Sequence, residues 1–450
     1  MKRTEILNEV NRALDGRRLV WFGTRGDDIE SVLSIAGFDS AFSILSASRK
    51  RRTVDYYSLE QLTGVRVDLD QYDLDEEPNA EAFAEFRRYA LRALAGPSAV
   101  FTYRPSILVS ALCFARRDRC RYLGMFKDHQ AAFEHKPWVE SAVRDEGVPA
   151  IPWHYVADEE QAIGKEDVRN GPVMLRRSHS SGGTGLVRVD DPDQIRAMWP
   201  EEREAYVSVA PYIDGGLPLN VSGVVWSDGI TLHPLSVQLI GLPSCTARPF
   251  GYCGNDFSAV ADLPLGLIDQ IEQTVLTVGH WLRKHGYVGA FGVDLLVKDD
   301  VPLFTEVNPR FQGSTHLSCE ISAGMDESCL VLDHLAAHLG VAAPPSLRLR
   351  DYIASSDVSH VVAHWLGPAD AEIDGTTLVD EVRTPRLRRS DVVAAPHVAT
   401  QPGATVARLT LEGSVTRTGF DLDPALAQPI SAWQTHRLVS GTTEKQAVER

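Results

Sequence analysis

Two apolar segments near residue 300 constrain this chain more than any other feature, because each of them carries a carboxylate. Phe291–Val297 and Leu303–Val307 read as strands separated by a short polar stretch that is typical of a hairpin turn. Asp294 lies in the first strand and Glu306 in the second, with Asn308 two residues further on. Side chains alternate along a strand, so Glu306 and Asn308 share one face. If the strands pair around the polar stretch, Asp294 falls on that face too.

These three side chains are typical of a site for a hard cation. Two carboxylates and an amide oxygen between apolar strands form the kind of site that Mg²⁺ shares with substrate phosphates. Taken separately, Asp294 also fits a solvated strand carboxylate, and Glu306 fits an ion pair with Arg310. Both carboxylates would be costly on core-facing positions without a cation, so we expect Asp294, Glu306 and Asn308 to hold a metal. Arg310 stands beside them, where it could neutralise charge on a transferring phosphoryl group.

A second segment, residues 172–187, has features of a phosphate-binding loop. Its first strand carries Arg176 near the end, and a run of small residues follows that includes Gly182, Gly183 and Gly185. Small residues let backbone N–H groups approach phosphate oxygens closely, while a cation offsets the phosphate charge. An unliganded hairpin rich in serine and glycine fits the same residues equally well. The loop leads into a strand, so it is neither a Walker loop nor a dinucleotide-binding turn.

A third segment, residues 206–213, is an apolar strand that contains Ala210, Tyr212 and Ile213. Such a strand can offer backbone groups to the edge of an adenine ring. Any buried strand has the same appearance, so by itself this segment reads as core.

Composition excludes several classes of protein. The chain has 450 residues, of which 44% are hydrophobic and 24% charged, and its net charge is -16. An acidic protein lacks the basic footprint that nucleic acid and anionic lipid require, so we expect neither partner. The six cysteines form no CxxC pair, which favours reduced thiols. No signal-like segment and no apolar run of about 18 residues is visible, and a soluble, cytoplasmic protein is expected.

The order of predicted elements divides the chain into three parts. Residues 1–124 alternate strands and helices, which favours an α/β domain with a parallel sheet. Residues 125–343 mix strands and helices in an α+β arrangement. After Pro344-Pro345, residues 344–450 read as a small β-rich domain, with strands expected at Asp391–Ala395 and Thr405–Leu411.

The three segments, in this order, resemble the ATP-grasp superfamily over roughly residues 100–340. The spacing of Asp294 and Glu306, followed by Asn308-Pro309-Arg310, is similar to the magnesium motif of that family and is the most specific part of the match. The resemblance implies an ATP-grasp fold with an N-terminal Rossmann-like pre-ATP-grasp domain and a small β-rich C-terminal domain.

The same resemblance implies how ATP is held. The phosphates would be held by Lys136 and Arg176, and Lys127 is a competing candidate for the lysine. The glycines would fold over the phosphates, and the adenine would lie against the backbone of the third segment. The family usually has lysine where this chain has Arg176, and the glutamate that usually binds the ribose is missing. The residues assigned to the cofactor by the resemblance are Lys136, Arg176, Gly182, Gly183, Gly185, Ala210, Tyr212 and Ile213.

The activity that the resemblance implies is ATP-dependent ligation of a carboxylate to an amine. An acyl phosphate would form with release of ADP, and an amine, from an amino acid or peptide, would then displace phosphate. The cofactors would be ATP with one or two Mg²⁺ ions, Mn²⁺ being the alternative, and Arg310 would be catalytic. The layout resembles ligases of peptide-antibiotic pathways, the group of the pheganomycin peptide ligase, and many such enzymes are homodimers. A phosphotransferase on the same fold and a non-catalytic nucleotide-binding module remain the alternatives.

Overall fold

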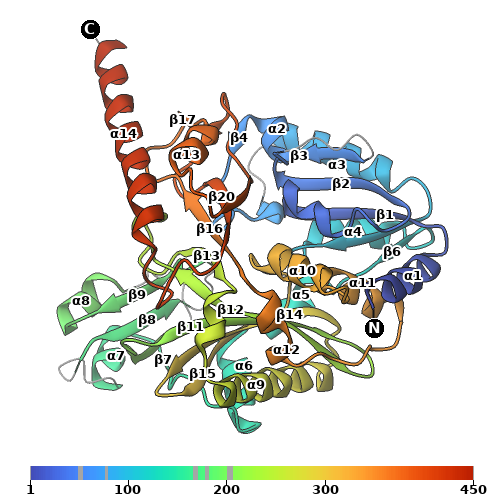
Figure 1. The fold of residues 1–450 in the computed structure, drawn as a ribbon, viewed down its shortest axis with the longest axis horizontal. Helices are drawn as coiled ribbons and strands as arrows, with labels where there is room; N and C mark the ends of the chain where they lie inside the picture. Colours follow the sequence, from blue (N-terminus) through green and yellow to red (C-terminus); the bar gives the residue numbers. More distant parts are fainter. Residues whose placement is uncertain are drawn as a thin grey trace.

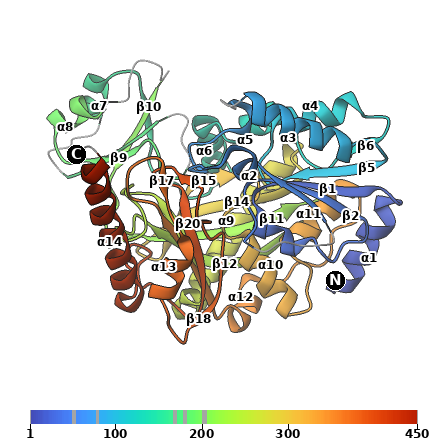
Figure 2. The ribbon, with the colours of Figure 1, turned by 90° about the horizontal axis from the view of Figure 1, so that it is seen from above.

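The protein contains four β-sheets in its described residues, and the largest lies between the N-terminal sheet and a small antiparallel lobe. A computed structural model describes residues 2–48, 54–76, 80–165, 171–177, 182–199 and 206–448. Among these residues the sheets have five, four, eight and three strands. Figure 2 shows the N-terminal sheet and the small green lobe at opposite ends of the molecule, with the large sheet beneath them.

The N-terminal part forms a parallel sheet with the strand order β3-β2-β1-β5-β6. Strand β2 pairs with one edge of β1, and strand β5, which comes later in the chain, pairs with the other edge. Such a reversal of strand order opens a crevice at the carboxyl ends of the strands, where ligands bind in open α/β sheets. Its elements are α1 (Arg3–Leu14), β1 (Arg18–Arg25), η1 (Gly26–Ser31), β2 (Phe38–Leu45), β3 (Asp55–Ser58), α2 (Leu59–Thr63), β4 (Val65–Arg66), η2 (Leu74–Glu76), α3 (Ala80–Ala93), β5 (Ser98–Thr102), α4 (Ile107–Ala115) and β6 (Cys120–Tyr122).

Two helices lead into a small antiparallel lobe with the strand order β7-β10-β8-β9. The helix α6 begins where Pro137 occupies the first turn and His135 accepts a hydrogen bond from the backbone of Trp138 at 3.4 Å. Proline is favoured in the first turn of a helix because its missing N–H has no intrahelical partner there. The elements are α5 (Lys127–Phe133), α6 (Lys136–Asp145), β7 (His154–Val156), α7 (Glu159–Lys165), β8 (Val173–Arg177), β9 (Leu186–Val189), α8 (Pro192–Ala197) and β10 (Val207–Pro211).

The central sheet is antiparallel and follows the order β15-β14-β11-β12-β13-β16-β20-β18. One helix, α9, packs on β11 and β15, and another, α11, packs on β11 and β14 and against α1 (Figure 1). The elements of this part are β11 (Leu217–Val225), β12 (Ile230–Ile240), β13 (Tyr252–Asp256), η4 (Ala259–Asp262), α9 (Leu265–Lys284), β14 (Gly289–Lys298), β15 (Val301–Asn308), α10 (Thr315–Gly324), α11 (Leu330–Leu339), α12 (Leu349–Tyr352) and η5 (Ile353–Ser355).

The C-terminal part extends the central sheet, because β16 pairs with β13 and then with β20. A short sheet of β17, β19 and β4 joins this part to the N-terminal part. The chain ends in the long helix α14, which projects from the body in Figure 1. The elements are β16 (Val358–His364), β17 (Ala371–Glu372), α13 (Gly375–Glu381), β18 (Leu387–Asp391), β19 (Ala399–Thr400), β20 (Thr405–Glu412) and α14 (Pro424–Val448).

One predicted strand in this part is misplaced. The strand β18 ends at Asp391, whereas the sequence predicted a strand from Asp391 to Ala395. Val392 has a φ of 53°, which breaks extended backbone, and its N–H donates to Asp27 at 2.8 Å. A contact with the N-terminal part therefore outweighs the β propensity of this valine-rich segment. The division into three domains remains a prediction. Within the described ranges, no helix has the length and apolarity needed to cross a bilayer.

Candidate active site

The predicted metal-binding residues meet on the hairpin of β14 and β15. Asp294 lies directly opposite Glu306, and Gly292 lies opposite Asn308. The Asn308 amide nitrogen donates to Asp294 at 3.0 Å and to Glu306 at 3.4 Å. The expected hairpin therefore places both carboxylates and the amide on one face.

Three further amides surround the Asp294 carboxylate, and sequence reasoning did not identify them as part of the site. Asn220 of β11 donates to Asp294 at 2.6 Å, Gln238 of β12 donates at 3.1 Å, and Gln312 donates at 3.4 Å. Asn220 also donates to Gln312 at 2.9 Å, so the amides contact one another as well as the carboxylate. Only Gln312, four residues after Asn308, lies close enough in sequence to be found from the motif.

The two carboxylates differ in charge state. Burial and the charge of Glu306 raise the pKa of Asp294 to about 7. Burial also opposes ionisation of Glu306, but the positive charges of Lys136, Arg176 and Arg310 outweigh it and lower the pKa of Glu306. Two acids this close share a site that favours a cation.

The donor set fits a magnesium ion. In the described parts of the chain, no three acidic, histidine or cysteine side chains gather into a metal site, so any metal here would be held by the two carboxylates and amide oxygens. Mg²⁺ accepts such a set because it is bound through one or two carboxylates and keeps waters and phosphates as its remaining ligands. Asn308 directs its amide nitrogen to the carboxylates and its oxygen to Arg310 at 3.1 Å, and a 180° rotation of the amide exchanges these atoms.

A cavity of about 320 Å³ runs from these carboxylates between the small lobe and the central sheet. Apolar side chains line its far end: Ile151, Trp153, Met174, Leu186, Tyr212, Ile213 and Leu296. A slot with apolar walls and a charged end has the character of a site for a flat ring linked to an anionic group.

Arg176 lies at this cavity in a buried ion pair. Its guanidinium donates to Glu140 at 2.6 Å, and the two side chains are 5% and 2% exposed. It also lies 4.0 Å above the ring of Trp153. Glu140 and Trp153 were not predicted as site residues, and their partnership with Arg176 joins helix α6 to strand β8.

The predicted phosphate loop lies partly outside the described residues, since residues 178–181, which include His179, are among those not described. Its described glycines have left-handed backbone conformations, with φ values of 55°, 76° and 73° at Gly182, Gly183 and Gly185. A Cβ atom on Gly182 would lie 2.1 Å from the Asp70 side chain, and one on Gly183 would lie 1.9 Å from a backbone oxygen. These two positions therefore require glycine because of both backbone angle and space.

The predicted adenine-binding strand is β10 and the residues after it. Tyr212 and Ile213 line the smaller cavity. Ala210 is buried and pairs with Met174 of β8. The N–H of Tyr212 donates to the Pro172 carbonyl at 2.9 Å, so this amide is already engaged.

The structure separates the two candidate lysines. Lys136 lies 3.6 Å from Glu306, and its side chain is 10% exposed. Lys127 instead pairs with Asp73 at 2.8 Å and with Asp75 at 2.7 Å. Lys136 is therefore the lysine at the carboxylate hairpin.

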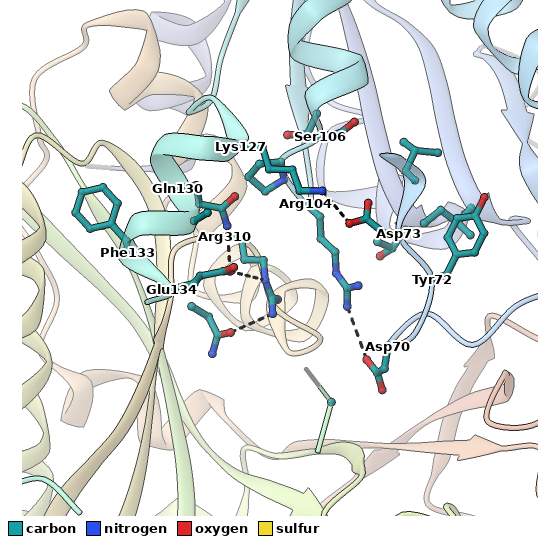
Figure 3. Close-up of a pocket in the computed structure, with 18 of the residues that line it drawn as sticks. Asp70, Tyr72, Asp73, Arg104, Ser106, Lys127, Gln130, Phe133, Glu134 and Arg310 are labelled. Atoms are coloured by element: carbon teal, nitrogen blue, oxygen red, sulfur yellow. Dashed lines mark hydrogen bonds and ion pairs between the residues drawn. The ribbon is translucent and has the colours of Figure 1, made fainter. Parts of the chain in front are cut away.

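A second cavity, of about 610 Å³, lies on the other side of Glu306 and reaches the carboxyl ends of β1, β2 and β5. Arg104 and Arg310 line both cavities. Figure 3 shows these two side chains extending into the chamber, Arg104 toward Asp70 and Arg310 toward Glu134. The ion-pair distances are 3.7 Å and 3.5 Å. The two cavities thus meet at a charged junction.

Other polar residues near the motifs are engaged elsewhere. Arg248 pairs with Asp68 and with Asp70, Glu320 pairs with Arg389 at 3.0 Å, and the half-buried His316 lies 3.0 Å from Arg408. These contacts join the central sheet to its neighbours.

Comparison with known proteins identifies the fold. Residues 139–314 match a family model described as an ATP-grasp domain. The chain superposes on a biotin carboxylase domain from Hydrogenobacter thermophilus, crystallised with ADP and magnesium, with a TM-score of 0.61 at 13% identity, covering 88% of this chain and 86% of that one. It also superposes on N5-carboxyaminoimidazole synthase from Aspergillus clavatus with a TM-score of 0.59 at 13% identity, covering 93% and 99%.

The chain has the ATP-grasp fold. Among curated relatives, a formate-dependent phosphoribosylglycinamide formyltransferase from Synechococcus sp. (strain WH7803) is 26% identical over 210 residues, covering 45% of this chain but only 49% of the relative. The enzyme of the same name from Hydrogenovibrio crunogenus is 22% identical over 306 residues, covering 62% and 72%. In ATP-grasp terms, the small lobe and the central sheet are the two halves that enclose the smaller cavity.

Proposed function

We propose that this protein is an ATP-dependent carboxylate–amine ligase of the ATP-grasp fold, which forms an amide through an acyl phosphate. The observation that carries the proposal is the position of the Asp294–Glu306–Asn308 hairpin, at the junction between a slot with apolar walls and a larger chamber. A nucleotide in the slot would direct its phosphates to this junction, where a second substrate in the chamber can reach them.

The residues at the junction have distinct tasks in this proposal. Asp294, Glu306 and Asn308 would hold one or two Mg²⁺ ions, which supply charge neutralisation to the nucleotide phosphates. Lys136 would bind a phosphate oxygen, since it lies 3.6 Å from Glu306. Arg310 lines both cavities and would stabilise negative charge as it develops between them.

The reaction balances without a protein nucleophile. A substrate carboxylate oxygen attacks the γ-phosphorus of ATP, the bond to the β-phosphate oxygen breaks, and ADP leaves. The nitrogen of an amine then attacks the acyl carbon, inorganic phosphate leaves, and the nitrogen gives up a proton. Gly182 and Gly183 lie against Asp70 and the backbone of Phe250, and closure of this loop over bound nucleotide would exclude water from the acyl phosphate.

We further propose that the ligase acts in the synthesis of a peptide or other small natural product. Its substrates would be amino acids or peptides, and it would form a homodimer. The layout resembles peptide-antibiotic ligases, and this supports the choice of substrates for the first experiment.

The test is Mg²⁺-dependent release of ADP in the presence of pools of amino acids and short peptides, with and without hydroxylamine. We expect carboxylate-dependent ADP release and formation of a hydroxamate. Glu306→Gln should lower turnover by at least about a hundredfold because it removes a metal ligand. The matched control is Asp300→Asn, an exposed carboxylate in the turn of the same hairpin with a φ of 59° that asparagine tolerates.

Three outcomes would contradict the proposal. Normal turnover of Glu306→Gln would exclude Glu306 as a metal ligand. ADP release with a stable phosphorylated product and no hydroxamate would indicate a phosphotransferase. ATP binding without turnover in any pool would indicate a nucleotide-binding module.

A further inference from the structure

Three arginines from separate parts of the chain gather where the two cavities meet. Arg25 ends strand β1, Arg104 follows β5, and Arg310 follows β15. All three line the smaller cavity, and Arg104 and Arg310 also line the larger one. Arg25 and Arg104 have no assigned role in the reaction described above.

The three arginines differ in their carboxylate partners, and Arg310 lies 3.5 Å from Glu134. The Arg104 guanidinium lies 3.7 Å from Asp70, but Asp70 also pairs with Arg248 at 3.0 Å. Arg25 forms no ion pair with a described carboxylate, and its buried Nε has no hydrogen-bond partner in the described part of the chain. Burial and the charges of Arg310 and Arg25, opposed by those of Asp70 and Glu134, lower the pKa of Arg104 to about 10. The guanidinium is still charged at neutral pH, and such a group of cations favours a bound anion.

The other end of the larger cavity has a different character. Phe22 and Phe42 stack with ring centroids 4.7 Å apart, and Phe86 meets Phe42 edge to face at 5.4 Å. These rings belong to the core of the N-terminal part, where Phe22, Phe42 and Phe86 are 5%, 0% and 2% exposed, and they border the cavity beside Tyr72 and Val109. This wall lies at the carboxyl ends of β1 and β2, beside the point where the strand order reverses, which is where open α/β sheets bind ligands.

We propose that the larger cavity binds the acid substrate as a carboxylic acid with an apolar, ring-sized body. Its carboxylate lies among Arg25, Arg104 and Arg310, and its body extends toward the wall of Phe22, Phe42 and Phe86. This inference rests on the proposed function, since it names the class of acid that the ligase activates. The carboxylate is then held beside Glu306 and Asn308, at the end of the cavity where the nucleotide phosphates arrive.

A phosphate-bearing acceptor, of the kind named in the phosphoribosylglycinamide relatives, fits the cavity less well. Such a substrate requires cations at the end remote from the carboxylate hairpin. Of the described side chains there, Lys127 is the cation that lines the cavity, and it is paired with Asp73 at 2.8 Å and Asp75 at 2.7 Å. The other uncharged side chains that line the cavity there are aromatic, aliphatic, hydroxyl or amide groups. Inorganic phosphate is therefore the competing probe in the test.

The experiment is a ligand-observed NMR titration of the full chain, loaded with MgADP, using 3-phenylpropionate. The comparison ligands are 3-phenylpropanamide, which lacks the charge, acetate, which lacks the body, and inorganic phosphate. We expect 3-phenylpropionate to bind at least about tenfold more tightly than either comparison ligand, because the amide loses the ionic contact and acetate loses the apolar contact. Arg104→Ala should abolish the preference for the acid over the amide, measured on protein saturated with MgADP.

Two further variants control the experiment. Arg25→Gln removes the charge but keeps a polar side chain, and it should weaken 3-phenylpropionate binding in protein saturated with MgADP, so it tests the site if Arg104→Ala folds poorly. Arg119→Ala removes an exposed arginine whose side chain is 58% exposed and which does not line either cavity, and it should bind all four ligands like the wild type.

The outcomes separate this inference from the ligase proposal. Three results would overturn the inference. They are equal binding of acid and amide, unchanged acid binding in both Arg104→Ala and Arg25→Gln, and preferred binding of phosphate. If hydroxamate forms from pooled acids while Arg104→Ala keeps the wild-type KM for them, the ligase stands and the inference fails. If 3-phenylpropionate binds through Arg104 but no acid supports ADP release, the acid site stands and the ligase proposal fails.

Discussion

Replacing Arg176 by alanine is expected to destabilise the small lobe and to weaken ATP binding, and the two effects can be separated. Arg176 contacts Glu140 at 2.6 Å with both side chains almost fully buried. At this distance the attraction between the charges is about 6 kcal/mol for an effective dielectric constant of 20. Much of it offsets the loss of hydration, but removing one partner leaves a buried charge and typically costs about 3 to 5 kcal/mol. Loss of the stacking on Trp153 at 4.0 Å adds about 1 kcal/mol.

The assay is urea unfolding followed by tryptophan fluorescence, together with the KM for ATP. Arg176→Ala should lose about 4 to 6 kcal/mol of unfolding free energy, a large part of the stability of an ordinary domain. The double variant Arg176→Ala/Glu140→Gln should recover about half of that loss, since no charge is left unpaired. The KM for ATP should stay high in both variants if Arg176 binds phosphate.

The matched control is Arg196→Ala in the same lobe. Arg196 is 47% exposed and pairs with Glu160 at 3.0 Å, so its loss should cost less than about 1 kcal/mol. Unfolding of Arg176→Ala at the wild-type urea midpoint would refute the reasoning about the buried pair. Recovery of both stability and KM in the double variant would show that Arg176 acts only as a structural partner of Glu140.

Three other predictions follow from single residues. Lys136→Ala should raise the KM for ATP by about tenfold, whereas Lys127→Ala should leave it unchanged. Equal effects of the two variants in initial-rate assays would contradict the assignment of Lys136 as the phosphate-binding lysine. Gly182→Ala places a Cβ atom 2.1 Å from Asp70 at a φ of 55°, so it should lower kcat. Gly164→Ala, which has open space around the new Cβ atom, serves as the control. A wild-type kcat for Gly182→Ala would exclude close packing of this loop during turnover. Burial lowers the pKa of His334 to about 4, so the unfolded state binds the extra proton and stability falls by up to about 1.4 kcal/mol per pH unit as pH drops from 6.5 toward 4. Urea midpoints measured across this range should fall less steeply in His334→Gln, and parallel curves would contradict it.

Several features of this fold were predicted because their causes are local in the sequence. The hairpin of β14 and β15 follows from two apolar segments around a polar turn, and alternation within strands places Asp294, Glu306 and Asn308 on one face. The glycines of the loop mark left-handed backbone because side chains disfavour that conformation. The fold class follows from the order of such elements.

Other residues of the site could not be predicted because strand order and domain packing bring them together. Asn220 and Gln238 reach Asp294 only because β11 and β12 follow β14 in the central sheet. Glu140 pairs with Arg176 because helix α6, which packs on β15 and α9, places Glu140 within reach of strand β8. The C-terminal strands also read as a unit of their own in the sequence, yet β16 extends the central sheet.

The sequence by itself determined the carboxylate hairpin and the glycines of the loop, because these depend on the spacing of residues a few positions apart. Tertiary structure alone decided which lysine lies at the hairpin, which amides surround Asp294 and where the three arginines meet. Arg25, Arg104 and Arg310 are separated by long stretches of chain, and no local pattern records that strands β1, β5 and β15 end at the same junction. Their contact depends on how the sheets pack, which is a property of the whole chain.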